Sequence, residues 1–313
     1  MIFDAHGDIL TDIYDEIKKG NKDPFTTRHL EFYNKSGITH SIFVNWTDPF
    51  HKTRQAFYEC FDVAIDYIKQ KSNIFKLCYN LNDVNQAVKE NKLGVILGVE
   101  GIKYLDQPSN IKMLYDKGIR HASLTWNDKN EYATGLLESD TGLTKKGAAV
   151  IKMMQSLGMV IDLAHANPMT FKDVFDLVDG PLVVTHGNAK ALCDHQRNYT
   201  DEQLQMIKDK NGVIGVCAVA SFIASDKANQ NVTFLAKHID YIVKLIGINH
   251  VGIGLDVCYY LYENVTDTHV EGLKTIGETK NLLLELEKLG YCKDDIDKIA
   301  YKNFNRVLNE VLK

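Results

Sequence analysis

The sequence contains little proline and no long apolar run. Proline accounts for only 5 of the 313 residues, and the prolines are spread along the chain. We find no Ser/Gly tract, charge block or internal repeat that would mark a domain boundary. No apolar stretch approaches the roughly 20 residues needed to cross a bilayer. We therefore predict a single domain over residues 1–313 that does not span a membrane.

The chain also lacks excess positive charge and paired cysteine motifs. Its 36 basic residues against 41 acidic ones give a net charge of −5, which argues against a nucleic-acid-binding surface. The six cysteines are scattered, with no Cys-x-x-Cys pair, as is typical of free thiols in a reducing compartment. The first residues lack the basic start and apolar core of a secretory leader. We expect a soluble, cytoplasmic protein that acts on small molecules, and a homodimer is compatible with this sequence.

Short apolar runs recur along the whole chain and alternate with segments of helical periodicity. This alternation is typical of βα units around a parallel sheet. The eight expected strands are Met1–Ala5, Ile38–Trp46, Leu93–Val99, Ile119–Thr125, Met159–Ala164, Pro181–Thr185, Gly212–Ala218 and His250–Leu255. Eight such strands predict an α/β fold, a (β/α)8 TIM barrel. A doubly wound open sheet is the competing architecture.

Helix signals lie between these runs. Thr144 and Gly158 bound a predicted helix over Lys145–Leu157, and Thr200 to Gln203 has the pattern of a capping box. These signals support the assignment of helices between the strands.

Polar side chains stand just past the ends of several predicted strands, where a barrel assembles its active site. An extended backbone points residues i and i+2 to the same side, so the His and Asp after the first strand should converge. The polar strand-end residues are His6, Asp8, Glu100, His165, His186 and Asp256.

Five of these residues form a ligand set for two divalent metals. Imidazole and carboxylate groups both bind zinc, and the two oxygens of one carboxylate can bridge two ions. We place His6, Asp8 and Glu100 on one ion. The same glutamate then bridges to a second ion held by His165 and His186. Two such ions can lower the pKa of a shared water and polarise a carbonyl, so the expected chemistry is hydrolysis.

Each residue also has a simpler interpretation. A lone His at a strand end is more often hydrogen-bonded than metal-bound, although five suitable ligands at four strand ends are harder to dismiss. Asp256 is a sixth ligand, a strand-end cap or a proton carrier. Arg197 is a surface residue or a group that holds a substrate carboxylate. We interpret most other histidines as surface or helix residues: His29, His40, His51, His121, His195, His238, His250 and His269.

At these residues the sequence resembles the membrane (renal) dipeptidase family of metallopeptidases. The matching motifs run through nearly the whole chain in order. They are Asp4-Ala5-His6-Gly7-Asp8, Gly98-Val99-Glu100-Gly101, Gly118-Ile119-Arg120, Leu124-Thr125, Gly142-Leu143-Thr144, Asp162-Leu163-Ala164-His165, Thr185-His186, Arg197-Asn198, Val251-Gly252-Ile253-Gly254 with Asp256, and Asn303-Phe304 with Arg306-Val307-Leu308.

The resemblance implies a barrel with two zinc ions that cleaves free dipeptides, with Glu100 as the bridging ligand. It also implies that Arg197 and Asp256 contact the substrate, and that the C-terminal residue of the dipeptide can be a D-residue. The leader and lipid-anchor tail of the animal members have no counterpart in this sequence, which fits an intracellular, microbial-type enzyme.

Two departures from the family pattern affect the substrate site. Where the animal enzymes have a histidine thought to steady the oxyanion, this chain has Trp126. An indole N–H donates one hydrogen bond but cannot carry a proton. The family often continues Asp256 with Phe-Asp-Gly, whereas Val257 and Cys258 follow it here. We expect these changes to alter substrate preference.

We therefore predict a zinc-dependent dipeptidase in which a hydroxide bridging two zinc ions attacks the peptide carbonyl. Glu100 and Asp256 are the predicted catalytic residues, and Arg197, Trp126 and Asp256 the predicted substrate-binding residues. One rival is another binuclear amidohydrolase-type hydrolase, which usually opens with His-x-His and bridges its metals with a modified lysine. The other rival is a catalytically silent barrel that binds a metal or ligand.

Overall fold

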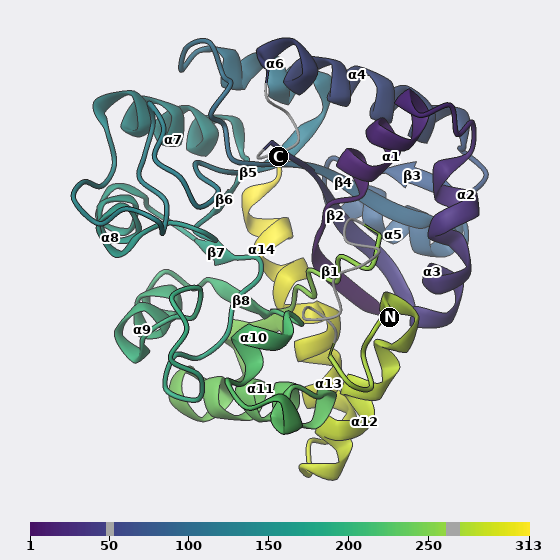
Figure 1. Ribbon diagram of the computed structural model, residues 1–313, viewed down its shortest axis with the longest axis vertical. Helices are drawn as coiled ribbons and strands as arrows, with labels where there is room; N and C mark the ends of the chain where they lie inside the picture. Colours follow the sequence, from purple (N-terminus) through teal and green to yellow (C-terminus); the bar gives the residue numbers. More distant parts are fainter. Residues whose placement is uncertain (48–52, 261–269) are drawn as a thin grey trace.

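Eight parallel strands form the centre of the computed structural model, which describes residues 1–47, 53–260 and 270–313. They pair in the order β1-β2-β4-β5-β6-β7-β8-β9, and β1 lies beside β9, so the sheet closes into a nearly complete barrel surrounded by helices (Figure 1). The strands of this path are β1 (Ile2–Gly7), β2 (Ile38–Trp46), β4 (Leu93–Glu100), β5 (Ile119–Ser123), β6 (Val160–Asp162), β7 (Val183–Val184), β8 (Val213–Val216) and β9 (Val251–Ile253). The predicted (β/α)8 barrel is confirmed, and the open-sheet alternative is wrong.

One strand was missed by sequence reasoning. β3 (Phe75–Leu77) pairs with the start of β4 outside the barrel path. A strand of three residues is too short to show alternation, which explains why the apolar pattern did not indicate it.

The helices follow the strands with clear caps. Thr144 Oγ1 accepts a hydrogen bond from Gly147 N at 3.1 Å, and Gly158 ends the same helix with φ 75°. The capping box at Thr200 and Gln203 is also present. The helices are α1 (Ile9–Lys18), α2 (Pro24–Arg28), α3 (Leu30–Ser36), α4 (Arg54–Gln70), α5 (Leu81–Lys89), α6 (Asn110–Lys117), α7 (Lys145–Leu157), α8 (Pro168–Leu177), α9 (Asp201–Asp209), α10 (Ala220–Ile223), α11 (Val232–Ile246), α12 (Lys280–Lys288), α13 (Lys293–Asp297) and α14 (Asn303–Val311).

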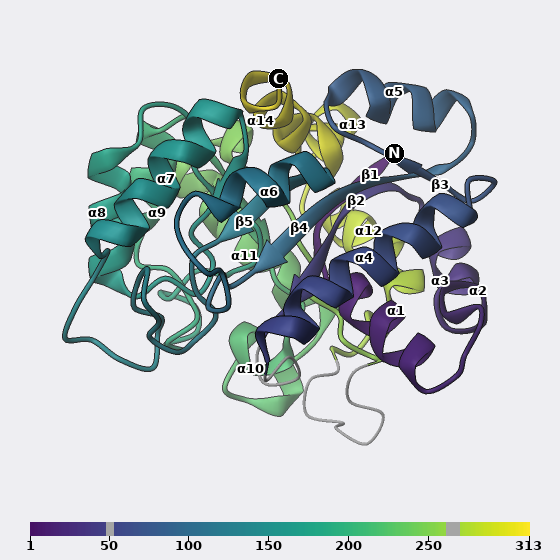
Figure 2. The same ribbon diagram turned by 90° about the horizontal axis from the view of Figure 1, so that it is seen from above.

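The amino-terminal end of the barrel is closed by α14. Arg306 on this helix donates to the backbone carbonyls of Asn211 and Asn249, which lead into β8 and β9. The turned view places α14 at the opposite side of the molecule from α10, which follows the carboxyl end of β8 (Figure 2). One apolar cluster joins strand and helix side chains: Phe3, Ala5, Ile42, Val44, Ile96, Val160, Val183 and Val213 with Phe304, Val307, Leu308 and Leu312.

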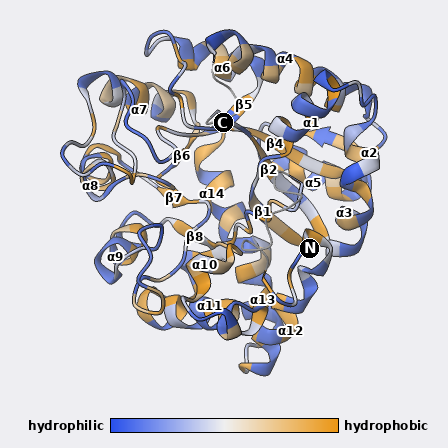
Figure 3. Cartoon of the chain, in the orientation of Figure 1, coloured by the Kyte–Doolittle hydropathy of each residue, from blue (hydrophilic) through white to orange (hydrophobic). Residues whose placement is uncertain are grey.

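Burial follows hydropathy in the rest of the molecule. The strands are mostly hydrophobic, whereas the surrounding helices carry hydrophilic residues along much of their length (Figure 3). A larger apolar cluster fills the space between the strands and the helices. Strands buried on both faces are expected to read as continuous apolar runs, which is how they were found in the sequence.

The seam between β1 and β9 is bridged by a side chain. Asp4 Oδ1 accepts hydrogen bonds from Leu255 N at 2.9 Å and from His6 N at 3.4 Å. Gly254 leaves no room for a side chain, because an added Cβ would lie 1.7 Å from the Thr185 carbonyl oxygen. The hydrogen bond from Leu255 N to Asp4 thus holds the first and last strands of the barrel together just below the polar strand ends.

Some histidines are not where we expected them. His40 lies inside β2, His121 inside β5 and His29 between α2 and α3, and all three are buried, so the surface or helix interpretation is wrong for them. His51 and His269 lie outside the described residues. All six cysteines are free thiols. Among the helices that the structure describes, none combines the length and the apolar character that a bilayer span requires.

Candidate metal centre

His6 and Asp8 meet at the carboxyl end of β1, but not through a regular extended backbone. In the pairing with β2, Asp4 lies opposite Ser41 and Gly7 opposite Phe43, so β1 has one more residue than β2 between these pairs. This bulge changes the direction of the end of β1. Asp8 has φ −75° and ψ 33° at the N-cap position of α1, where its side chain makes no capping hydrogen bond. His6 Nε2 lies 3.7 Å from Asp8 Oδ1. The predicted convergence is present, produced by a bulge and a turn.

Glu100 lies at the centre of the cluster. It ends β4, and its Oε1 lies 2.8 Å from His165 Nε2, 3.5 Å from His186 Nε2 and 3.7 Å from His6 Nε2. Thr47 Oγ1 donates to the Glu100 backbone carbonyl at 3.1 Å, which fixes the strand end. One carboxylate oxygen therefore faces three imidazole nitrogens that come from three different strand ends.

His165 and His186 both turn an unprotonated nitrogen toward the cluster. His165 Nδ1 lies 2.7 Å from Asn127 Oδ1, which can only accept, so Nδ1 carries the proton. Thr185 Oγ1 donates to Asp162 and lies 3.0 Å from His186 Nδ1, so this nitrogen donates to the hydroxyl in turn. The two Nε2 lone pairs then face each other at 2.9 Å. Arg197 Nη2 lies 3.1 Å from His165 Nε2 and donates to one of these lone pairs, and the His186 lone pair is left to bind a metal ion.

Asp162 organises this side of the cluster. Its carboxylate accepts from Thr185 Oγ1 at 2.6 Å, from Thr185 N at 2.9 Å and from Ala164 N at 2.9 Å, and it lies 3.0 Å from His121 Nε2. Burial alone would raise the pKa of Asp162, but hydrogen bonds from His121 and Thr185 outweigh it and lower the pKa. Asp162 is therefore an ionised positioning group behind His186.

The charges of the cluster call for a cation. Burial, reinforced by Arg197, holds the pKa of His165 well below its usual range, and burial with His6 does the same for His186. Burial raises the pKa of Glu100 well above its usual range. Burial lowers the pKa of His6, but the nearby carboxylates of Glu100 and Asp8 prevail and raise it to about 10. Positive charge is thus most stable where the carboxylates meet.

Asp256 stands across the pocket from Glu100, after β9. Its Oδ1 lies 3.9 Å from His6 Nε2, and its side chain is 16% exposed. Asp256 and His165 have φ 53° and 64°, which is strained for residues other than glycine. The other two described non-glycine residues with positive φ are Asn91 and Asn211, which follow helix ends. Backbone strain at two strand ends that share one pocket is typical of functional sites.

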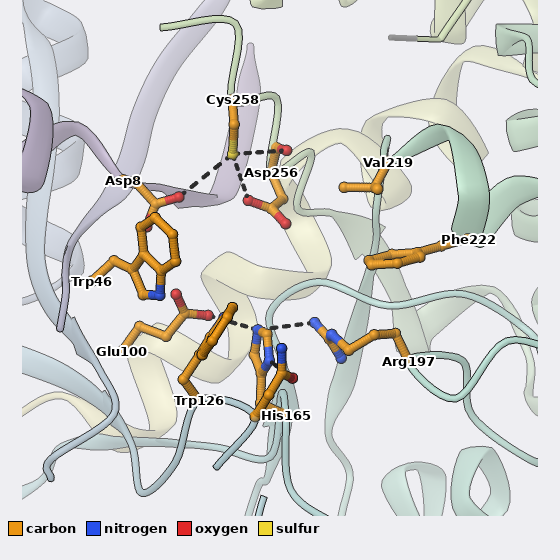
Figure 4. A pocket seen from close by; sticks show the side chains of 11 residues that line it. Asp8, Trp46, Glu100, Trp126, His165, Arg197, Val219, Phe222, Asp256 and Cys258 are labelled. Atoms are coloured by element: carbon orange, nitrogen blue, oxygen red, sulfur yellow. Dashed lines mark hydrogen bonds and ion pairs between the residues drawn. The ribbon is translucent and has the colours of Figure 1, made fainter. Parts of the chain in front are cut away.

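A cavity of about 170 Å³ opens over these residues (Figure 4). Trp46 and Trp126 line one part of it, with ring centroids 5.4 Å apart, and Phe222 lines another. Arg197 reaches in with its side chain buried, and its Nη2 lies 3.1 Å from His165 Nε2. The cavity-lining residues are Asp8, Trp46, Glu100, Trp126, Asn127, His165, Arg197, Val219, Phe222, Asp256 and Cys258.

The donor set fits divalent ions. Asp8 Oδ1 and Glu100 Oε1 are buried and have no hydrogen-bond donor among the described residues. Ligand atoms of His6, Glu100 and His186 lie within 4.8 Å of one another, as do those of His6, Asp8 and Asp256. Asp256 thus joins a three-residue group, whereas His165 reaches the cluster through its contacts with Glu100 and His186.

Sequence reasoning brought the main site residues together but missed several neighbours. The six polar strand-end residues and Arg197 meet in one place, with Trp126 on the cavity wall. Asn127 and Phe222 were not singled out, because a loop amide and a helix phenylalanine carry no local signal of a site. Asp162 was noticed only within the motif that ends in His165.

Fold and site together define a class: a barrel metallohydrolase, with histidine and carboxylate ligands at the carboxyl ends of parallel strands. The family model of membrane dipeptidase, peptidase family M19, matches residues 1–313. The chain therefore belongs to the membrane dipeptidase family of metallopeptidases. The resemblance seen in the motifs, and the enzyme class that it implies, are confirmed.

Individual proteins are similar to this chain over much of its length. A Klebsiella pneumoniae protein from the pqqA 5' region is 31% identical over 255 residues, 78% of this chain and 92% of that protein. Dipeptidase aclJ of Aspergillus oryzae is 31% identical over 225 residues, which is 70% of this chain but 52% of the fungal protein. The solved structure of a metallo peptidase from Rhodobacter sphaeroides, liganded with a phosphinate mimic of L-Ala-D-Ala, shares the fold with a TM-score of 0.84, 23% identity and coverage of 100% and 99%.

Proposed function

We propose that this chain is a zinc-dependent dipeptidase that hydrolyses the peptide bond of free dipeptides. The observation that carries the proposal is the approach of one Glu100 oxygen to three histidine nitrogens, at 2.8, 3.5 and 3.7 Å. Two of these nitrogens belong to imidazoles that offer lone pairs. Membership of the membrane dipeptidase family supports a dipeptide as the substrate.

The residues suit two ions that share Glu100. His6 and Asp8 complete one ligand set, and His165 and His186 complete the other. When bound, two zinc ions supply an activated water near neutral pH and polarise the carbonyl that it attacks. Imidazole nitrogens and carboxylate oxygens are ordinary zinc ligands, which is why zinc is the metal proposed.

The protein's own side chains orient the substrate. Arg197 binds the terminal carboxylate of the dipeptide, because its Nη1 is buried and makes no hydrogen bond to the described residues. Asp256 carries a proton from the attacking water to the leaving amine, since it borders the cavity opposite Glu100. Trp126 closes the wall where the animal enzymes have a histidine, and it shapes the pocket without moving a proton.

The small cavity favours a short substrate. At about 170 Å³ it is well below the volume of pockets that enclose drug-sized ligands, about 300 to 1,000 Å³. A D-residue at the C-terminal position is part of the proposal, since the related Rhodobacter sphaeroides metallo peptidase holds a mimic of L-Ala-D-Ala.

The test is turnover by metal-stripped and zinc-reloaded protein on a panel of L,L and L,D dipeptides. We expect cleavage only after zinc is restored, and none of dipeptides whose C-terminal carboxylate is amidated. Cleavage of a cyclic amide, lactone or phosphoester instead would favour an amidohydrolase-type enzyme. Metal binding without turnover of any of these compounds would favour a silent binding barrel.

A homodimer stays one option for the oligomeric state, and the cytoplasmic location and the absence of a nucleic-acid partner stay predictions. Size-exclusion chromatography with light scattering measures the first directly.

A further inference from the structure

We propose that the Cys258 thiol is an additional ligand of the ion held by His6 and Asp8, and that it makes this position selective for thiophilic divalent metals. The inference rests on the proposed metal centre and deepens it. It concerns a residue of this chain at which the sequence departs from the pattern that its family often shows.

The thiol lies between two carboxylates. Cys258 Sγ is 3.2 Å from Asp256 Oδ1 and 3.6 Å from Asp8 Oδ2. Figure 4 shows the sulfur between these two side chains, at the edge of the cavity. His6 Nε2 completes the ring, at 3.7 Å from Asp8 Oδ1 and 3.9 Å from Asp256 Oδ1. The thiol therefore adjoins the same two carboxylates that approach His6 Nε2, and it faces the second oxygen of Asp8.

These four separations are comparable with the edges of a tetrahedral site. With zinc bonds of about 2.0 Å to nitrogen or oxygen and about 2.3 Å to sulfur, neighbouring ligand atoms lie about 3.3 to 3.6 Å apart. The observed edges run from 3.2 Å at the thiol to 3.9 Å at His6.

A second feature points to a ligand at this position. Asp8 Oδ1 is buried and has no hydrogen-bond donor among the described residues, and its side chain is only 5% exposed. An unpaired buried carboxylate oxygen is costly unless a cation satisfies it. The Cys258 thiol is a weak donor whose nearest carboxylate oxygen is Asp256 Oδ1, so it does not pair with Asp8 Oδ1.

The backbone holds Cys258 in place. The left-handed turn at Asp256 folds the chain back, so that Cys258 Sγ lies 3.4 Å from the Asp256 carbonyl. Two residues further on, Arg28 Nη2 donates to the Tyr260 carbonyl at 2.8 Å, and the Tyr259 hydroxyl lies 2.8 Å from His29 Nδ1. The segment that presents the thiol is thereby anchored to the region of α2.

A sulfur ligand has a clear chemical consequence. Thiolate favours zinc and cadmium over manganese and magnesium, which prefer oxygen ligands. On binding, the thiol releases its proton to solvent as the sulfur–metal bond forms. We therefore expect the native protein to hold cadmium and cobalt with a sulfur in the coordination sphere.

The experiment is a titration of metal-stripped full-length protein with Cd²⁺ and, separately, with Co²⁺. Wild-type protein should develop the ultraviolet thiolate-to-metal charge-transfer band, and C258S should lose it. Cadmium affinity of C258S should fall by about 10-fold or more, the scale known for metal-site partners, while Mn²⁺ affinity changes little. The matched controls are C217S, whose sulfur lies 3.9 Å from Asp256 Oδ2, and C292S at an exposed position; both should keep the band.

The outcomes separate the two proposals. A band that persists in C258S, or disappears equally in C217S, overturns the ligand role of Cys258. Metal binding and dipeptide cleavage without any such band overturn this inference and leave the proposed function standing, whereas a wild-type protein that neither binds metal nor cleaves dipeptides overturns the proposed function. If C258S does not fold, the ¹¹³Cd NMR shift of the wild-type protein decides, because a sulfur ligand moves it strongly downfield of an all-nitrogen and oxygen site.

Discussion

The two ends of the barrel use the same strands in opposite ways. On β1, Phe3 packs against Phe304 of α14 with ring centroids 5.1 Å apart, and three residues later His6 faces the carboxylate of Glu100. The amino-terminal end is closed by apolar side chains, and the carboxyl-terminal end is lined by buried polar ones. Stability and chemistry are therefore built at different ends of a single sheet.

The difference is energetic as well as spatial. Burying an apolar side chain stabilises the fold by about 1.5 to 3 kcal/mol, whereas a buried polar atom without a partner costs about 1 to 3 kcal/mol. Asp8 Oδ1 and Glu100 Oε1 are such atoms. The apolar end offsets what the polar end costs, so mutations at the two ends should separate stability from activity.

The largest effect is expected at the polar end. Glu100→Gln keeps the shape of the side chain but removes the charge that both ligand sets share. We expect kcat/KM on dipeptides to fall by more than about 10³-fold, beyond the loss of a single oxyanion donor, together with loss of bound metal. Steady-state kinetics and metal analysis measure this. The melting temperature of the metal-free variant should not be lower than that of the metal-free wild-type protein. A fully active, metal-loaded variant would refute the ligand assignment.

The opposite result is expected at the apolar end. Phe304→Ala removes a buried ring from the cluster under the barrel and should lower the free energy of unfolding by about 3 to 5 kcal/mol. Denaturant unfolding measures the loss, with Leu284→Ala at an exposed position of α12 as the control. At low temperature, where the variant is folded, kcat should be close to wild type. A large drop in kcat there would show that the two ends are coupled.

A smaller effect should come from Arg197→Lys. The lysine keeps the charge but loses the paired hydrogen bonds that a guanidinium makes with a carboxylate. We expect kcat/KM to fall about 10- to 100-fold, the equivalent of one charged hydrogen bond, mainly through KM. An unchanged KM, with the whole loss in kcat, would contradict this role.

The smallest expected effect is a pH dependence at the apolar end. Burial lowers the pKa of His40 to about 4, and His40 Nε2 lies 2.8 Å from Asn305 Oδ1 on α14. Because the folded pKa lies below the unfolded value of about 6.5, only the unfolded chain binds the proton between these values. Stability should thus be full above pH 6.5 and fall as the pH drops toward 4, by about 1.4 kcal/mol at pH 5.5 from this group.

Denaturant midpoints between pH 7 and pH 5 measure this dependence. His40→Gln should flatten it, whatever its effect on stability at pH 7. An unchanged slope would assign the dependence to another group, such as His238, whose pKa burial also lowers to about 4.

The features that could be predicted from the sequence are those that a short stretch of residues determines by itself. The meeting of the strand-end polar residues was predictable, because parallel strands of a barrel bring their carboxyl ends together wherever the helices lie. His40 and His121 were misplaced, because a strand buried on both faces shows no period that distinguishes a buried polar residue. The pairings of Asn127 with His165 and of Cys258 with Asp8 join distant segments, and only the folded chain reveals them.

The position of α14 in the chain sets an order of events during synthesis. All eight strands leave the ribosome before Phe304 and its neighbours. Until then the amino-terminal end of the barrel is uncovered, and the apolar side chains around Phe3 face water or a chaperone. The strand ends that form the catalytic site can therefore assemble early in synthesis. The chain becomes resistant to proteases only after α14, which follows all the strands, has been synthesised and has packed against them.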